Sequence, residues 1–68
     1  MNPDIFNMSL RKFLKRVGVT SQRELEDAVK QALDSGQLQG HEALNVRMTL
    51  QVGELKLEHI VDDKIRLE

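Results

Sequence analysis

The chain has 68 residues, with 10 Lys and Arg against 11 Asp and Glu, and a formal charge of −1 at pH 7. Its 31% charged and 40% hydrophobic content is that of an ordinary globular protein, and its length predicts a single small domain over residues 1–68. The near-neutral charge excludes a generally basic nucleic-acid coat protein, and the lack of Cys excludes disulfide frameworks, thiolate zinc sites and Cys nucleophiles. No apolar run approaches the roughly 20 residues of a membrane span, and the first ten residues lack signal-peptide features, so we expect a cytoplasmic protein.

The first predicted helix covers residues 3–17. Asn2 is a typical N-cap residue, and Pro3 fits the first helical position because its missing N–H costs nothing there. Gly18 predicts the end of the helix, and Ile5 and Met8 project away from its apolar side. The apolar residues share one stripe and are Phe6, Leu10, Phe13, Leu14 and Val17. The opposite side carries four cations, which are Arg11, Lys12, Lys15 and Arg16.

A second helix is predicted over residues 21–35. Ser21 and Glu24 have the spacing of a capping box, and Gly36 predicts the C-terminal end. The spacing of Leu25, Ala28, Val29, Ala32 and Leu33 is that of a buried stripe. Because the connection is short, we expect the two helices to pack against each other through their apolar stripes.

The periodicity changes from 3.6 to 2 after residue 42, which predicts a strand over 43–52. Gly53-Glu54 suggests a two-residue hairpin turn leading to a second strand over 55–60. This register places Leu55 opposite Val52 and His59 opposite Met48, all on the inward face.

A third strand is predicted over 64–68, with Ile65 and Leu67 on the inward face. A two-residue turn at Asp62-Asp63 would put them on the wrong face, so we expect an odd-length loop or a bulge there, with Asp63 in a left-handed conformation. The predicted fold is therefore α+β, with two N-terminal helices packed on a C-terminal three-stranded antiparallel β-meander (ααβββ).

Three segments carry a resemblance that extends over nearly the whole chain. They are FNMSLRKFLKRVGVTSQRELEDAV (6–29), LNVRMTL (44–50) and IRLE (65–68). Together they resemble a family of small uncharacterised bacterial proteins of about this length, a domain of unknown function. The resemblance implies a stand-alone bacterial domain. It assigns no activity and no functional residue.

Residues 13–33 also suggest a helix-turn-helix, in which a glycine-containing turn precedes a capped second helix. A plain helical hairpin is favoured instead, because Leu14 stands where close helix crossing needs a small residue, and Glu24 and Asp27 stand where the second helix should be apolar. The second helix also has a net charge of −2, which opposes binding to phosphates.

The charges are segregated, with +3 on residues 1–17 and −2 on each of the segments 18–40 and 41–68. The predicted basic face, Arg11, Lys12, Lys15 and Arg16, could bind an anionic partner such as nucleic acid, membrane headgroups or an acidic protein. The simpler interpretation is a solvated face, balanced by acids of the second helix or of a symmetry mate.

Evidence for catalysis or metal binding is weak. His41-Glu42 and His59 with Asp62-Asp63 are scattered and lack the fixed spacing of metal ligands. The simpler interpretation is that His41 is an exposed loop residue and that His59 is partly buried beside Met48 and Leu67. No serine has a paired base and no glycine-rich phosphate loop is present. We therefore expect no enzyme, no catalytic, cofactor-binding or metal-binding residues, and no cofactor.

The leading hypothesis is a small non-catalytic interaction module that self-associates through sheet edges or the outer helix surface. It depends on size, because a short chain without disulfides has a marginal core. The alternative is a nucleic-acid-binding protein that uses the basic face of the first helix. A weaker third hypothesis is a metal or ligand site near His59.

Overall fold

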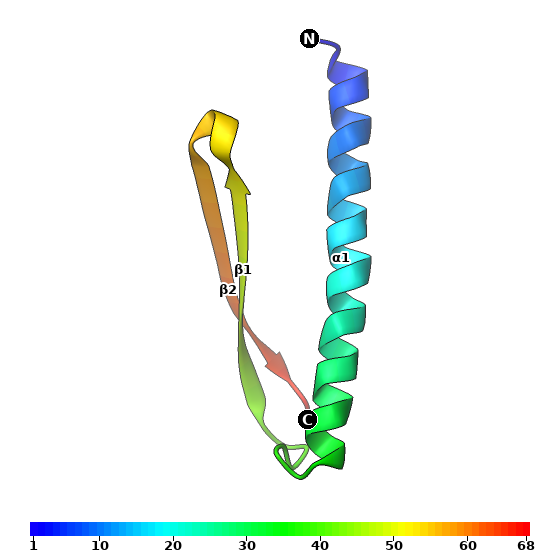
Figure 1. Ribbon diagram of the computed structural model, residues 1–68, viewed down its shortest axis with the longest axis vertical. Helices are drawn as coiled ribbons and strands as arrows, with labels where there is room; N and C mark the ends of the chain where they lie inside the picture. Colours follow the sequence, from blue (N-terminus) through cyan, green and yellow to red (C-terminus); the bar gives the residue numbers. More distant parts are fainter. The chain divides into compact units, whose positions relative to one another are not determined.

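The computed structural model describes all 68 residues as one long helix, α1 (Pro3–Asp34), followed by a hairpin of β1 (Ala43–Val52) and β2 (Leu57–Arg66) (Figure 1). A short 3-10 helix, η1 (Gly53–Leu55), lies between the two strands, which form a two-stranded antiparallel sheet. The chain divides into a helical unit, Met1–Gln37, and a hairpin unit, Leu38–Glu68. The fold is α+β in the order αββ, so the prediction of two helices and a three-stranded meander is wrong.

The two ends of α1 lie where the sequence predicts them. The Asn2 side chain caps the first turn by accepting hydrogen bonds from the backbone N–H groups of Asp4 (3.0 Å) and Ile5 (3.2 Å). Ser35 caps the other end, and Gly36 follows with a φ of +80°. This left-handed conformation has no steric cost for glycine, so a helix commonly ends there.

The predicted break at residues 18–20 is absent, because the helix runs through Gly18 and Ser21 without interruption. Seven of the ten residues of the two predicted apolar stripes lie along one line together with Ser21, and this line is called the α1 stripe below. Phe13, Val29 and Leu33 of the predicted stripes lie to its sides. Its members follow steps of four, four and three residues and are Phe6, Leu10, Leu14, Val17, Ser21, Leu25, Ala28 and Ala32. This repeat has about 3.67 residues per turn, close to the helical value, so the stripe stays on one side of α1. An interior glycine costs only about 1 kcal/mol, which is too little to end such a helix.

Replacing the glycine in the middle of α1 tests this continuity. Gly18 does not have a positive φ, and a Cβ atom there would meet nothing within 4 Å. We expect Gly18→Ala to raise the free energy of unfolding by about 0.5–1 kcal/mol, because Ala has the higher helix propensity. Urea denaturation followed by circular dichroism at a fixed chain concentration measures the change. Gly36→Ala is the control and should destabilise, and a similar loss for Gly18→Ala would show that a helix ends at Gly18.

The hairpin has the predicted first strand but a different turn. β1 covers the predicted residues, and Val52 pairs with Leu57 while Leu50 pairs with His59. The loop consists of η1 and Lys56, whose φ of 51° is left-handed, in place of the predicted two-residue turn. The observed register differs from the predicted one by two residues. Because side chains alternate with a period of two, each strand still keeps its predicted face.

Residues 64–66 of the predicted third strand form the C-terminal end of β2, and Leu67 and Glu68 lie beyond it. Asp62 and Asp63 lie inside this strand, and Lys56 is the one residue other than glycine with a positive φ. The predicted loop or bulge and the left-handed Asp63 are therefore wrong. One continuous strand places Ile65 on the same face as Leu57 by simple alternation, so no extra residue is needed to correct the register.

No residue of the chain is buried. The hairpin has one predominantly apolar face, called the hairpin apolar face below. Its members are Leu44, Val46, Met48, Leu50, Val52, Leu57, His59, Val61, Asp63 and Ile65. Within it Leu44, Val46, Leu50 and Val52 are half-buried, and the rest are exposed. Neither unit therefore forms a core of its own, and the leucine and valine residues expected in a core lie on the surface of the helix or of the hairpin.

Candidate functional site

The α1 stripe is the apolar surface of the helical unit. Its first half carries large side chains, with Phe6 54%, Leu10 40% and Leu14 52% exposed. Its second half is smaller in volume and includes Ala28 and Ala32. Contiguous apolar patches on folded proteins are often found at interaction sites.

The predicted basic face exists as one continuous surface on α1. Its four residues lie away from the stripe, are all exposed, and take part in no ion pair. They are Arg11, Lys12, Lys15 and Arg16. The structure therefore places four uncompensated positive charges within about two turns of one helix.

A shallow hollow lies beside the basic face near the N-terminal end of α1. Arg11 and Lys12 line it together with Ile5, Met8 and Ser9. Ile5 is 62% and Met8 is 71% exposed. The basic face is thus bordered by apolar side chains at one end.

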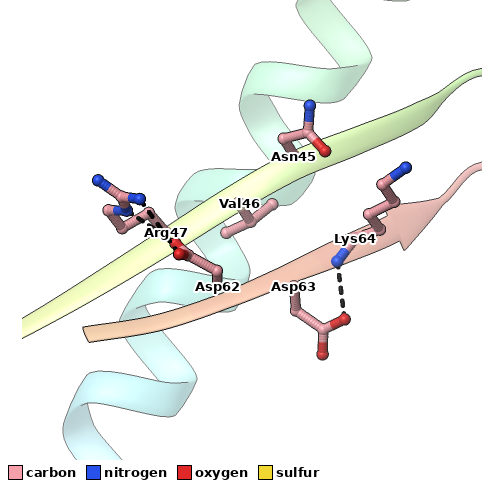
Figure 2. Close-up of a pocket in the computed structure, with 6 residues that line it drawn as sticks. All are labelled: Asn45, Val46, Arg47, Asp62, Asp63 and Lys64. Carbon is pink, nitrogen blue, oxygen red and sulfur yellow. Dashed lines mark hydrogen bonds and ion pairs between the residues drawn. The ribbon is translucent and has the colours of Figure 1, made fainter. Parts of the chain in front are cut away.

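An ion pair links the two strands on the polar face of the hairpin. Arg47 and Asp62 are direct cross-strand neighbours, and the guanidinium donates from Nε to Oδ1 (2.7 Å) and from Nη2 to Oδ2 (3.1 Å) (Figure 2). The hydrogen bonds to Asp62 raise the pKa of Arg47 above its usual value. The paired groups help to line an open hollow with Asn45 and Lys64. Because both side chains are well exposed, the pair mainly favours this register and adds little stability.

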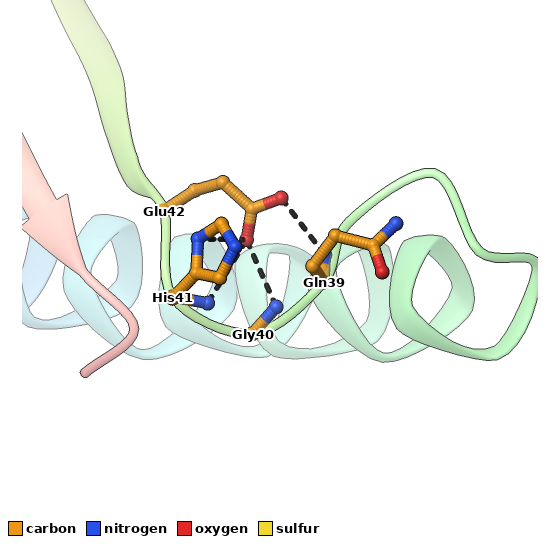
Figure 3. A network of polar contacts seen from close by, with 4 residues as sticks. All are labelled: Gln39, Gly40, His41 and Glu42. Carbon is orange, nitrogen blue, oxygen red and sulfur yellow. Dashed lines mark hydrogen bonds and ion pairs between the residues drawn. The ribbon is translucent and has the colours of Figure 1, made fainter.

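The loop before β1 folds around the Glu42 carboxylate. This carboxylate accepts hydrogen bonds from the backbone N–H groups of Gln39 (2.8 Å), Gly40 (2.9 Å) and His41 (3.1 Å) (Figure 3). These hydrogen bonds, with that from Gln39 the strongest cause, lower the pKa of Glu42 below its usual value of 4.5. Gly40 has a φ of +105°, a conformation that other residues rarely adopt. The carboxylate occupies the donors itself, so it organises the loop and leaves no site for an external anion there.

The Glu42 contacts predict a pH-dependent loop. Because the folded-state pKa is lowered, the ionised carboxylate stabilises the loop above pH 4.5, and this contribution is lost as the pH falls through the folded-state pKa. We expect the amide protons of Gln39 and Gly40 to lose protection against hydrogen exchange on acidification. Glu42→Gln should reduce their protection at neutral pH and remove its pH dependence. The exchange rates are measured by NMR, with Glu58→Gln in β2 as the control. An unchanged pH profile in Glu42→Gln would contradict this role.

Neither histidine belongs to a cluster of side chains that could bind a metal ion. His41 is exposed and lies 3.9 Å (Nδ1 to Oε1) from Glu42. His59 pairs with Leu50 and is exposed, so the prediction of a partly buried His59 opposite Met48 is wrong; Met48 pairs with Val61. The structure contains no group of three or more His, Cys, Asp or Glu side chains that could hold a metal ion.

Two further sequence-based interpretations are settled by α1. The helix-turn-helix and the helical hairpin both need a turn near Gly18, and α1 has none.

No helix of the structure combines the length and the apolar character needed to cross a membrane.

Sequence reasoning missed the Arg47–Asp62 pair and the role of Glu42. The predicted register placed Arg47 opposite Ile60 and put Asp62 in a turn, so the pair was hidden by the wrong hairpin loop. Gly40, six residues after the last helical residue and two before Glu42, is the signal that could have identified the Glu42 loop.

Comparison with known proteins gives a family and no closer relative. A family model described as a family of unknown function (DUF6494) matches residues 1–68. No curated protein and no solved structure matches the chain.

Proposed function

The chain belongs to this family of unknown function, and we propose that it is a small non-catalytic interaction module that associates with further copies of itself. The observation that carries the proposal is that neither the helical unit nor the hairpin unit buries any side chain of its own. The chain nevertheless has two predominantly apolar surfaces, the α1 stripe and the hairpin apolar face. These are the surfaces that a folded protein normally covers.

The energetics of each unit support this proposal. Ordering a residue costs about 1–2 kcal/mol of backbone entropy, which apolar burial must offset at about 25 cal/mol per Å². A lone two-stranded hairpin is marginally stable in water, and most helix stability in proteins comes from packing of an apolar face. A second copy supplies the same apolar surfaces again, and small domains without disulfides commonly gain stability in this way.

The surface hollows support a non-catalytic role. One hollow lies on the hairpin and another lies beside the basic face, and both are lined mostly by exposed side chains. Catalysis commonly relies on groups held in a pocket from which water is excluded. These hollows are open, and the binding of a protein surface suits them better.

Sedimentation velocity and thermal unfolding across the micromolar range test the proposal. We expect particles of at least twice the 7.8 kDa chain mass and a melting temperature that rises with concentration. A 7.8 kDa particle that is stably folded at every concentration, with a constant melting temperature, would overturn it.

A second candidate function is nucleic-acid binding through the basic face. It is favoured by one observation, namely that Arg11, Lys12, Lys15 and Arg16 take part in no ion pair. If all four contact phosphates of duplex DNA, the logarithm of the association constant falls with the logarithm of salt concentration with a slope of about −3.6. Fluorescence anisotropy with a labelled duplex measures this slope. Absence of binding at low salt would remove this candidate and would leave self-association as proposed.

A further inference from the structure

The α1 stripe has the same spacing when read in either direction from Ser21. Its members lie 4, 7 and 11 residues from Ser21 on both sides. They are Leu10, Leu14 and Val17 on one side, and Leu25, Ala28 and Ala32 on the other. A second helix can run antiparallel to the first, with its Ser21 level with Ser21 of the first and a two-fold axis between them. Each of these residues then lies level with a stripe residue of the second helix.

The sizes of these side chains favour the antiparallel arrangement. The axis places Leu10 level with Ala32 and Leu14 level with Ala28, so a large side chain meets a small one in these outer layers, while Val17 lies level with Leu25. Facing layers of large and small residues interdigitate at normal packing density. In a parallel pair the leucines would face leucines and the alanines would face alanines, so the helices would be too crowded at one end and too far apart at the other.

The charges favour the same arrangement. Residues 3–17 of α1 carry a net charge of +3, and residues 18–34 carry −2. The axis at Ser21 brings Lys15 level with Asp27 of the second copy and Arg16 level with its Glu26. A parallel pair would align the basic half with itself, and like charges at an interface disfavour that orientation.

We propose that α1 pairs antiparallel with α1 of a second copy about a two-fold axis at Ser21, which covers the stripe from Leu10 to Ala32. This inference rests on the proposed self-association and specifies its geometry. The paired segment is about 33 Å long at 1.5 Å per residue. The basic face stays on the outer side of the pair, so the acidic half of the partner balances its charge only at longer range.

Distances between spin labels in the full chain test the geometry. The chain has no native cysteine, so Lys12→Cys, Val19→Cys and Lys30→Cys each give one labelling site. All three positions are exposed and lie on the side of α1 away from the stripe, so their lateral separation across the pair is similar. Lys12 and Lys30 are nine residues from Ser21, and Val19 is two residues from it. The pairing predicts offsets along the axis of about 27 Å for the first two and about 6 Å for the third.

Double electron–electron resonance on variants that keep their helicity gives a clear set of outcomes. Equal long distances at Lys12 and Lys30 with a short distance at Val19 support the pairing. Three equal distances show a parallel pair, and unequal values at Lys12 and Lys30 show a different axis; either result overturns this inference while self-association stands. A folded 7.8 kDa particle without dipolar coupling overturns both proposals.

Disulfide formation gives an independent readout with a matched control on the same helix. Ser21→Cys places the two thiols at the axis, whereas the thiols of Ser9→Cys are about 36 Å apart along it. We expect the first variant to form a covalent dimer under mild oxidation much faster than the second. Equal rates, or faster dimer formation by Ser9→Cys, would contradict the proposed axis.

Discussion

Val17→Asp is expected to weaken self-association by at least about 100-fold, whereas Val19→Asp leaves it almost unchanged. Val17 is a half-buried member of the α1 stripe, while Val19 is 47% exposed and lies on the other side of the helix. Burying one valine contributes about 1.5–3 kcal/mol, and a two-fold dimer buries two. Since 1.4 kcal/mol is a factor of ten in affinity, loss of both side chains accounts for this effect, and the introduced carboxylates add to it.

The two valine variants form a matched pair. Each places Asp in the middle of α1, so each has the same cost in helix propensity. Sedimentation velocity over a concentration series gives the dissociation constants, and circular dichroism reports the helicity that is lost with the dimer. Equal weakening by both variants would show that the effect is on the helix itself. Full association of Val17→Asp would show that the chain associates through another surface, such as the hairpin apolar face.

Thr20→Pro is expected to lower the free energy of unfolding by about 3 kcal/mol. Thr20 lies near the centre of α1, where a proline removes a backbone hydrogen bond and its ring collides with the preceding turn. If residues 18–20 formed the predicted connection between two helices, proline there would be tolerated. The substitution therefore measures whether the helix is continuous.

Thr20→Ala is the control for the proline variant. It removes the hydrogen bond that the Thr20 hydroxyl donates to the Arg16 carbonyl oxygen (2.7 Å) but keeps the backbone N–H. Because alanine has a higher helix propensity than threonine, we expect little net change. Urea denaturation of both variants at one chain concentration gives the comparison. A proline variant as stable as Thr20→Ala would contradict the unbroken helix.

The helix ends were predictable because the signals at both are strong. Asn2 and Pro3 at the start, and Gly36 at the end, act through contacts within a few residues. The capping-box spacing of Ser21 and Glu24 is a weaker signal, and here it occurs in the middle of a helix. The continuous apolar stripe outweighs both this pattern and the small propensity cost of the glycine before it.

The candidate site was predictable to the extent that it depends on one helix. The side of α1 on which the basic face, Ile5 and Met8 lie follows from their angular positions in the sequence. The environment of His59 and the pairing of Arg47 with Asp62 depend on strand register. Alternation identifies the face of a strand residue, but it is equally consistent with any register that differs by two residues.

The sequence by itself determined the apolar stripe, the alternating strands, the segregation of charge and the membership of the family. The first three are periodic or compositional properties that neighbouring residues establish together, and the family follows from the match along the whole chain. The tertiary structure alone decided that the helix is continuous, that the hairpin closes with η1 and Lys56, and that no side chain is buried. Each of these depends on a balance between competing contacts, several of them between residues far apart in the chain. Small differences in free energy between these contacts decide the outcome. Such differences cannot be read from a local sequence pattern.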